Sequence, residues 1–308
     1  MLTRPIDGLI ENVIKYSKAV IRQGAYEIDR EGKFSEENFH YLADLGVLRI
    51  PFQRQNGGLD GNLQDILKVI RLVSKECAST ASVLLTQISF GIAPIHDYGT
   101  EEQKNFYLAD LLSGKQMGAF AMNELHSGSN LEEMQTTAVE TKTGWELNGQ
   151  KAYIFLTGRA TIYSVVARIH RLNGEKAFGI LLVPADTAGL QLTEKNEKMG
   201  IRGLPVGDLK FDQIKLKKEA LLGGQAGGKR QIQAIKDCNK LFVAAQALGL
   251  AIGVFEQALT YMQQDRRFGQ RLIDLLENQN KMAIAYSEIH ATKTMIESIG
   301  ILTQKMFA

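Results

Sequence analysis

The first third of the chain repeats apolar side chains with the period of an α-helix. Between residues 6 and 24 they recur every three or four positions after Pro5, a residue that suits the first turn of a helix. Residues 62–89 keep the same spacing, and residues 100–103 (Thr-Glu-Glu-Gln) have the form of a capping box. The pattern predicts an N-terminal α-helical domain over residues 1–117.

The middle of the chain changes to short, β-type apolar runs separated by turn residues. Three such runs are residues 145–149, 163–167 and 178–183. The pair Asn148-Gly149 is typical of a two-residue hairpin turn, because both residue types tolerate positive φ. We therefore predict an antiparallel β-barrel or sandwich domain over residues 118–224.

Helical spacing returns after the glycine-rich segment 223–229 and continues to the end of the sequence. The segment matches the glycines and the lysine of the phosphate-binding loop motif, but Arg230 occupies the position of the Ser or Thr that binds magnesium in that motif. We therefore interpret the segment as a domain linker. Gly249 and Gly253 are spaced for close helix packing. The prediction is an incomplete C-terminal helical bundle over residues 225–308, and the fold class is α+β with several domains.

Composition narrows the class of protein. The 308 residues include 36 Lys and Arg and 34 Asp and Glu, which gives a net charge of +2. This near-balance argues against nucleic acids and anionic membranes as partners. Cys77 and Cys238 have no CxxC partner, and the five histidines show no metal-ligand spacing, so we expect neither a disulfide framework nor a metal site. We find no signal peptide or membrane-spanning run and expect a soluble, cytoplasmic protein.

Several short motifs occur together in one order along the chain. They are Gly99–Lys104, Ala119–Glu124, Gly128-Ser129, Leu147–Lys151, Met199–Gly203, Ala244–Gly249 and Phe268-Gly269. Together they resemble the acyl-CoA dehydrogenase family, from about residue 30 to about residue 285. The resemblance implies FAD bound between the β domain and the helical bundle, in a homo-oligomer. In that family the flavin accepts a hydride from the β-carbon of an acyl-CoA thioester while a glutamate removes the α-proton.

The resemblance implies a set of flavin-contacting residues in the β domain. Phe120 and Met122 match the strand whose backbone faces the flavin ring. Asn123 replaces a threonine and can still donate a hydrogen bond, and Tyr153 replaces a tryptophan and keeps an aromatic wall. Phe155 replaces a threonine that hydrogen-bonds the reactive edge of the flavin, and it offers no donor.

Further cofactor residues are implied in the last domain. Asp265 falls where the family places an arginine on the FAD pyrophosphate of the neighbouring subunit, and Arg266 can compensate by a shift of one residue. Phe268 and Gln279 match positions at the adenine end, while Leu276 replaces a polar residue there. This part of the predicted FAD site therefore depends on a second subunit.

The substrate residues are implied in the same way. Ser129 matches a serine that contacts both the cofactor and the substrate region, and Asp237 and Lys240 match an Asp-x-x-Arg that grips the CoA portion. Some family members carry the catalytic glutamate just before that arginine, where this chain has Asn239. An amide cannot take the α-proton, and the family's more common glutamate would lie beyond Ala308, so we assign no catalytic residue.

Two readings of the function follow. The first is an FAD-dependent acyl-CoA dehydrogenase that passes electrons to an acceptor. Residues such as Leu84, Leu85, Ile88 and Phe90 would shape its acyl pocket or be ordinary core. The second is a non-catalytic partner subunit or decayed paralogue, or a truncated gene product. The helix 241–259 is apolar nearly all round, so we expect another surface to cover it. A second copy of the chain, in a dimer or tetramer, would provide that surface, or a complementary subunit would.

Overall fold

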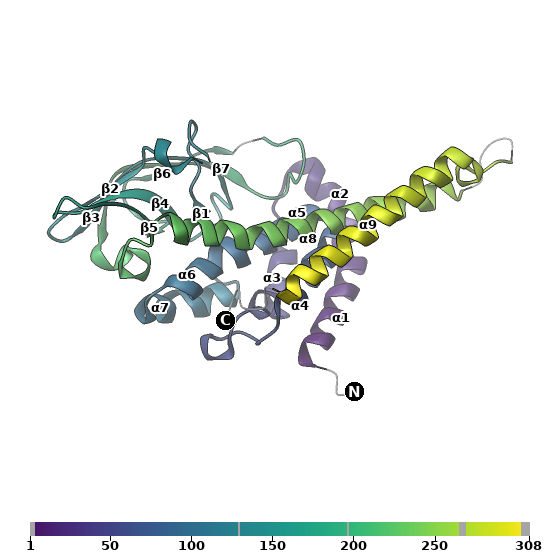
Figure 1. The fold of residues 1–308 in the computed structure, drawn as a ribbon, viewed down its shortest axis with the longest axis horizontal. Coiled ribbons are helices and arrows are strands. Elements are labelled where there is room, and N and C mark those ends of the chain that lie inside the picture. The colour runs from purple at the N-terminus through teal and green to yellow at the C-terminus, as the bar shows by residue number, and fades with distance from the viewer. Residues whose placement is uncertain (1–3, 129, 196, 265–268, 303–308) are drawn as a thin grey trace.

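The computed structural model describes residues 4–128, 130–195, 197–264 and 269–302, which form three regions (Figure 1). An N-terminal group of helices and a β-sheet lie side by side, and a hairpin of two long helices runs past both and projects beyond them. The predicted order of helices, strands and helices is confirmed. We keep the division after residues 117 and 224 as a proposal.

The N-terminal region is a cluster of short helices around an apolar core. The predicted capping box is present, because Thr100 Oγ1 accepts a hydrogen bond from the backbone N–H of Gln103 and the Gln103 side chain accepts one from the Thr100 N–H. The predicted helix 62–89 is interrupted at Cys77, which is extended. The α- and π-helical elements are α1 (Pro5–Tyr16), η1 (Ser17–Ile21), α2 (Arg22–Glu31), α3 (Glu36–Asp44), α4 (Leu63–Glu76), α5 (Ala78–Thr86), η4 (Gln87–Ile92), α6 (Ala93–Tyr98) and α7 (Glu101–Leu112); η2 (Val47–Arg49) and η3 (Arg54–Asn56) are 3₁₀ turns.

The middle region is one seven-stranded sheet with the order β1-β4-β2-β3-β7-β6, and β5 pairs with the other strands through β4. The pairings of β1 and β2 with β4 are parallel and the others are antiparallel, so the predicted antiparallel arrangement holds for only part of the sheet. The strands are β1 (Gly118–Ala121), β2 (Thr137–Glu140), β3 (Gly144–Phe155), β4 (Ile162–His170), β5 (Lys176–Pro184), β6 (Leu190–Lys195) and β7 (Val206–Lys217); short turns are η5 (Leu131–Glu133), η6 (Lys218–Ala220) and η7 (Leu222–Gly224).

The hairpin predicted at Asn148-Gly149 is wrong. Strand β3 continues through both residues, and its register with β7 shifts between Leu147 and Gly149. Gly149 has φ 144°, and a Cβ there would lie 2.6 Å from Thr136 Oγ1. The glycine is thus explained by a bulge and the close approach of a neighbouring strand, which is its other common role in sheets.

The C-terminal region is a hairpin of α8 (Gly228–Met262) and α9 (Leu276–Leu302), with the turn η8 (Leu272–Asp274) before α9. The predicted close packing at Gly249 and Gly253 is confirmed. A Cβ at either glycine would lie 2.3 Å from a backbone oxygen of α4, that of Arg71 or Lys75. The two glycines therefore let α8 lie directly against α4.

Two helical stretches are long and apolar enough to cross a membrane by length and composition alone. The first, Ala78–Tyr98, is 89% buried inside the protein, as the core helix of a soluble protein is. The second, Gly228–Met262, is 39% buried and packs on α4. Neither stretch is more than weak evidence for a membrane segment.

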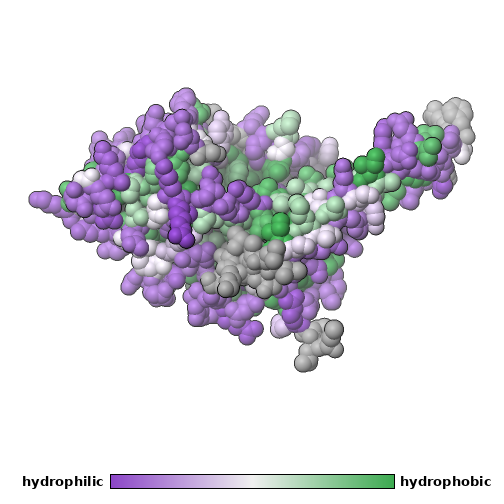
Figure 2. All heavy atoms as spheres, in the orientation of Figure 1, coloured by the Kyte–Doolittle hydropathy of each residue, from purple (hydrophilic) through white to green (hydrophobic). Residues whose placement is uncertain are grey.

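The side of the hairpin away from α4 carries exposed apolar residues. Val254 and Tyr261 on α8 and Ile284, Tyr286 and Met295 on α9 are each more than half exposed. Figure 2 shows apolar residues along the projecting part of the molecule. Among the described residues, the expected covering of the apolar helix 241–259 is thus found on the side that faces α4.

Candidate functional site

One candidate site lies where the sheet, the π-helical turn η4 and helix α8 meet. The rings of Phe120 in β1 and Phe90 in η4 are stacked, with centroids 5.3 Å apart and planes 12° apart. The preceding residue, Ser89, is fully buried, and its hydroxyl hydrogen-bonds Asn239 Oδ1 of α8 at 2.8 Å. Two adjacent residues of η4 therefore connect the strand to α8, and π-helical turns of this kind frequently occur at functional sites.

The end of β3 forms the second part of the site. Tyr153 has φ 58°, and its ring is 54% exposed. Its backbone N–H donates to Asp208 Oδ1 at 2.9 Å, which holds the residue in this unusual conformation. The register of β3 with β7 shifts between Lys151 and Ile154, and Phe155 beyond it is 39% exposed. The bulge thus turns two aromatic side chains towards the surface.

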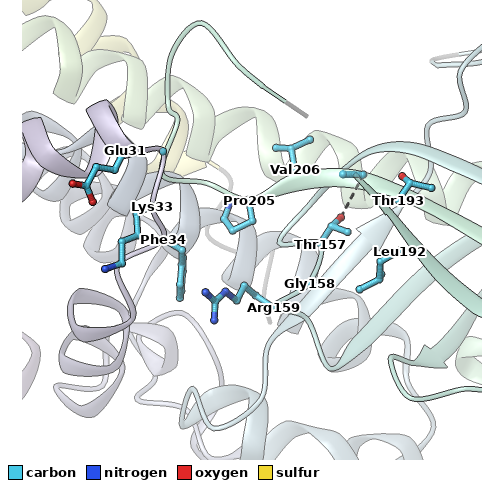
Figure 3. Close-up of a pocket in the computed structure, with 12 residues that line it drawn as sticks. Glu31, Lys33, Phe34, Thr157, Gly158, Arg159, Leu192, Thr193, Pro205 and Val206 are labelled. Carbon is cyan, nitrogen blue, oxygen red and sulfur yellow. Dashed lines mark hydrogen bonds between the residues drawn. The ribbon is translucent and has the colours of Figure 1, made fainter. Parts of the chain in front are cut away.

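A cavity of about 520 Å³ opens beside this strand end, between the sheet and the helical region (Figure 3). Val206, which pairs with Phe155, lines it together with Thr157, whose hydroxyl donates to the Ile154 carbonyl at 2.6 Å. On the opposite side the Arg159 guanidinium lies over the Phe34 ring, 5.3 Å from its centroid. Residues of both the helical region and the sheet line the cavity, and Tyr153 and Phe155 are not among the described residues that do so.

A buried ion pair lies behind the ends of β1 and β3. Lys151 Nζ is 2.9 Å from Glu124 Oε1 and donates to the Met122 carbonyl at 2.9 Å. Burial lowers the pKa of Lys151 to about 8, against the opposing effect of the Glu124 charge. Burial alone would raise the pKa of Glu124, but hydrogen bonds from Thr136 and Gln135 and the positive charge of Lys151 outweigh it and lower that pKa.

Glu124 and Lys151 lie within two of the motifs that resemble the family, but the sequence alone predicts no role for either residue. The sequence does not single out Ser89 either, because the helical stretch before it contains other polar residues, among them Ser82, Thr86 and Gln87. By the alternation of β3, Lys151 falls on the same side as the buried Trp145 and Leu147, where a charged side chain is rare. Only the folded chain therefore identifies this pair.

Other predicted residues lie away from this meeting point. Asp237 and Lys240 form an exposed ion pair on α8, with Nζ and Oδ1 2.7 Å apart. Gln279 is exposed near the start of α9, at the far end of the hairpin (Figure 1). The predicted residues Ser129, Arg266 and Phe268, and Asp265 with them, lie outside the described residues.

The site as described offers aromatic surfaces, backbone groups and an amide. Asn123 is half-buried, and its carbonyl accepts from the Ala152 N–H at 2.8 Å. Met122 and Phe120 are each 9% exposed, so the strand contributes mainly backbone to the surface. In the described parts of the chain no cluster of three or more His, Cys, Asp or Glu could hold a metal ion. The arrangement suits a flat aromatic ligand better than a metal.

Comparison with known proteins gives one consistent family. Models of the acyl-CoA dehydrogenase N-terminal, middle and C-terminal domains match residues 7–115, 119–214 and 227–303. A probable acyl-CoA dehydrogenase of Bacillus subtilis is 30% identical over 96% of this chain and 78% of its own length. A short-chain specific acyl-CoA dehydrogenase of Clostridium acetobutylicum is 29% identical over 88% of this chain and 72% of its own length.

A solved structure agrees with these sequence relatives. The butyryl-CoA dehydrogenase of Megasphaera elsdenii superposes with a TM-score of 0.92 at 27% identity. The similarity covers 99% of this chain and 81% of that protein. The three regions described above are therefore arranged in the two proteins in the same way.

Proposed function

This chain belongs to the acyl-CoA dehydrogenase family, and we propose that it is a flavoprotein that uses FAD to dehydrogenate a short acyl-CoA thioester between its α- and β-carbons. The observation that carries the proposal is the junction of β1, η4 and α8 through the Phe120–Phe90 stack and the Ser89–Asn239 hydrogen bond. This junction lies between the helical region and the sheet, where a substrate and a flat cofactor can meet.

The described residues fit the isoalloxazine ring of FAD. The exposed Tyr153 ring at the end of β3 offers a stacking surface, and the half-buried Asn123 side chain offers a hydrogen-bond donor. Bound FAD supplies the acceptor for the hydride that leaves the β-carbon. The protein holds that ring and the thioester next to each other, which is the larger part of its task.

Packing around the acyl end favours a short chain. Leu84, Leu85 and Ile88, which the sequence offered as pocket residues, are at most 4% exposed and lie in the core. A long acyl tail would have to displace these side chains, at a cost typical of overpacked cores. Lys240 on α8 is exposed and can attract a CoA phosphate, although it already pairs with Asp237. We propose that the CoA portion extends along this part of α8.

Asn239 places an amide at a position of the described site where a carboxylate could remove the α-proton of the substrate. Its side-chain oxygen shares the single Ser89 hydroxyl proton with the Leu85 carbonyl, at 2.8 and 2.7 Å, so the –NH₂ group of Asn239 remains to orient a substrate carbonyl. A carbonyl held by a donor acidifies the neighbouring α-proton. The same residue favours the second candidate function, a non-catalytic subunit, because an amide removes no proton.

We also propose a homo-oligomer. Met262, at the end of α8, lies about 35 Å along the helix from Asn239, so Gln279 just beyond the turn is remote from the site of its own chain. Gln279 and the exposed apolar residues of the hairpin are better placed to serve a second copy. Reoxidation requires an electron acceptor, and we place the enzyme in the cytoplasm.

The proposal is tested by the absorption spectrum of the purified protein. We expect flavin bands near those of free FAD, and bleaching of these bands when butyryl-CoA is added under anaerobic conditions. A protein that binds no FAD would overturn the proposed function. A protein that binds FAD but is not reduced by any short acyl-CoA would instead favour the non-catalytic subunit.

A further inference from the structure

The buried pair of Lys151 and Glu124 has no part in the chemistry proposed above, yet it lies directly behind the proposed flavin surface. The Lys151 side chain is completely buried and that of Glu124 is 9% exposed. Lys151 Nζ donates to Glu124 Oε1 and to the Met122 carbonyl, each at 2.9 Å. One ammonium group thus holds two points of the segment that follows β1.

Glu124 extends the same connection to the start of the next strand. Its Oε2 accepts from the Gln135 N–H at 2.7 Å, and its Oε1 accepts from the Thr136 N–H at 2.9 Å. Residues 122–124 and 135–136 are the two ends of the connection between β1 and β2. The carboxylate therefore joins both ends of this connection at one place.

The backbone hydrogen bonds between the strands of the sheet do not hold residues 122–124 in place. Strand β1 ends at Ala121. Among the described residues, one backbone hydrogen bond joins β3 to residues 122–124, from the Ala152 N–H to the Asn123 carbonyl at 2.8 Å. Without Lys151, the carbonyl of Met122 would lose a donor and Glu124 would be a buried, uncompensated charge. The position of residues 122–124 thus depends on this ion pair.

We infer that Lys151 is a positioning residue which, through Met122 and Glu124, fixes the backbone of residues 122–124 in the geometry that binds FAD. The inference rests on the proposed function. The ion pair does not need to add stability to do this, because a buried ion pair replaced as a whole by neutral groups of similar size is often as stable. Its contribution is to select one backbone position, which an apolar replacement would not specify.

The test separates stability from positioning. In the Lys151→Met/Glu124→Gln double variant no buried charge remains unpaired, so we expect a melting temperature near that of the wild-type protein. We expect FAD to dissociate at least about tenfold more readily, as measured by flavin fluorescence, because hydrogen bonds to charged groups hold the segment. With saturating FAD, kcat should fall while the KM for butyryl-CoA changes little.

A matched control is the exposed pair Lys104 and Glu101 on α7, whose charged atoms are 3.1 Å apart. The Lys104→Met/Glu101→Gln variant should keep wild-type FAD affinity and kcat. Wild-type affinity for FAD in the Lys151→Met/Glu124→Gln variant would overturn the inference while leaving the proposed function intact. A wild-type protein that binds no FAD would overturn the proposed function first.

Discussion

The hydroxyl of Ser89, on the π-helical turn η4, hydrogen-bonds the side-chain oxygen of Asn239 on α8 at 2.8 Å. The serine is fully buried, and the adjacent Phe90 stacks on Phe120 of the sheet. A residue of the long helix is thereby fixed beside the junction of all three regions. Whatever side chain occupies position 239 is held next to the proposed thioester site.

Replacing Asn239 with glutamate should therefore supply a proton acceptor that is stronger than water. A well-placed general base contributes a factor of about 10² to 10⁴, so we expect Asn239→Glu to raise the rate of flavin reduction by butyryl-CoA at least about tenfold. The measurement is anaerobic stopped-flow absorbance. Asn239→Gln is the matched control, because it has the same length and no basicity. Equal rates in the two variants would contradict this placement of Asn239.

Phe155 gives a second prediction about the flavin. A threonine there would provide a hydroxyl on the exposed strand end, and one hydrogen bond contributes about 1 kcal/mol, or about fivefold in affinity. We expect Phe155→Thr to bind FAD about fivefold more tightly than Phe155→Val, which has the same shape without the hydroxyl. Titration of the apoprotein with FAD, followed by fluorescence, measures the difference. Identical affinities would show that residue 155 does not face a polar edge of the cofactor.

The pH dependence of stability tests the environment of Lys151. Its pKa in the folded protein is about 8, against 10.5 for an ordinary lysine. Between pH 8 and 10.5 the unfolded chain holds this proton more tightly, so the wild-type protein gains stability relative to Lys151→Met as the pH rises, by at most about 1.4 kcal/mol per pH unit. Below pH 8 Lys151 is protonated in both the folded and the unfolded state and contributes no further change. Urea unfolding of both proteins at several pH values measures it, and a constant difference up to pH 10.5 would contradict the lowered pKa.

Packing of α8 on α4 gives a prediction about stability alone. A Cβ on Gly249 would meet the Arg71 carbonyl oxygen at 2.3 Å, so Gly249→Ala should lower the free energy of unfolding by about 1 to 3 kcal/mol. Gly8 on α1 has no atom near its Cβ position. Gly8→Ala should leave stability unchanged or raise it by up to about 1 kcal/mol, through helix propensity. Thermal unfolding of the two variants distinguishes steric crowding from propensity.

Periodicity predicted much of the fold, because helices and strands each bury one face in a regular rhythm. The capping box at Thr100 is predictable because it depends on residues close together in the sequence. The close packing at Gly249 is predictable because it depends on the small size of the residue. The turn predicted at Asn148-Gly149 is wrong because local turn preference cannot reveal that Thr136, just before β2, lies 2.6 Å from the Cβ position of the glycine. Tertiary contacts decided between a turn and a bulge there.

The candidate site was predictable only in part. Motifs in register located Phe120, Met122, Asn123, Tyr153 and Phe155 on two strand ends, which the structure places near each other. The pairs Ser89–Asn239 and Lys151–Glu124 join residues 150 and 27 positions apart. Single-sequence patterns carry no signal for such pairings, and these are the contacts that set the geometry of the site.

The most direct test of the central claim is the spectrum of wild-type protein reconstituted with FAD and then mixed anaerobically with butyryl-CoA. We predict that one FAD binds per chain and that its visible absorption is bleached by the substrate, which would lose a hydride from its β-carbon to FAD and its α-proton to water and so become crotonyl-CoA. A protein that takes up no FAD would contradict the account.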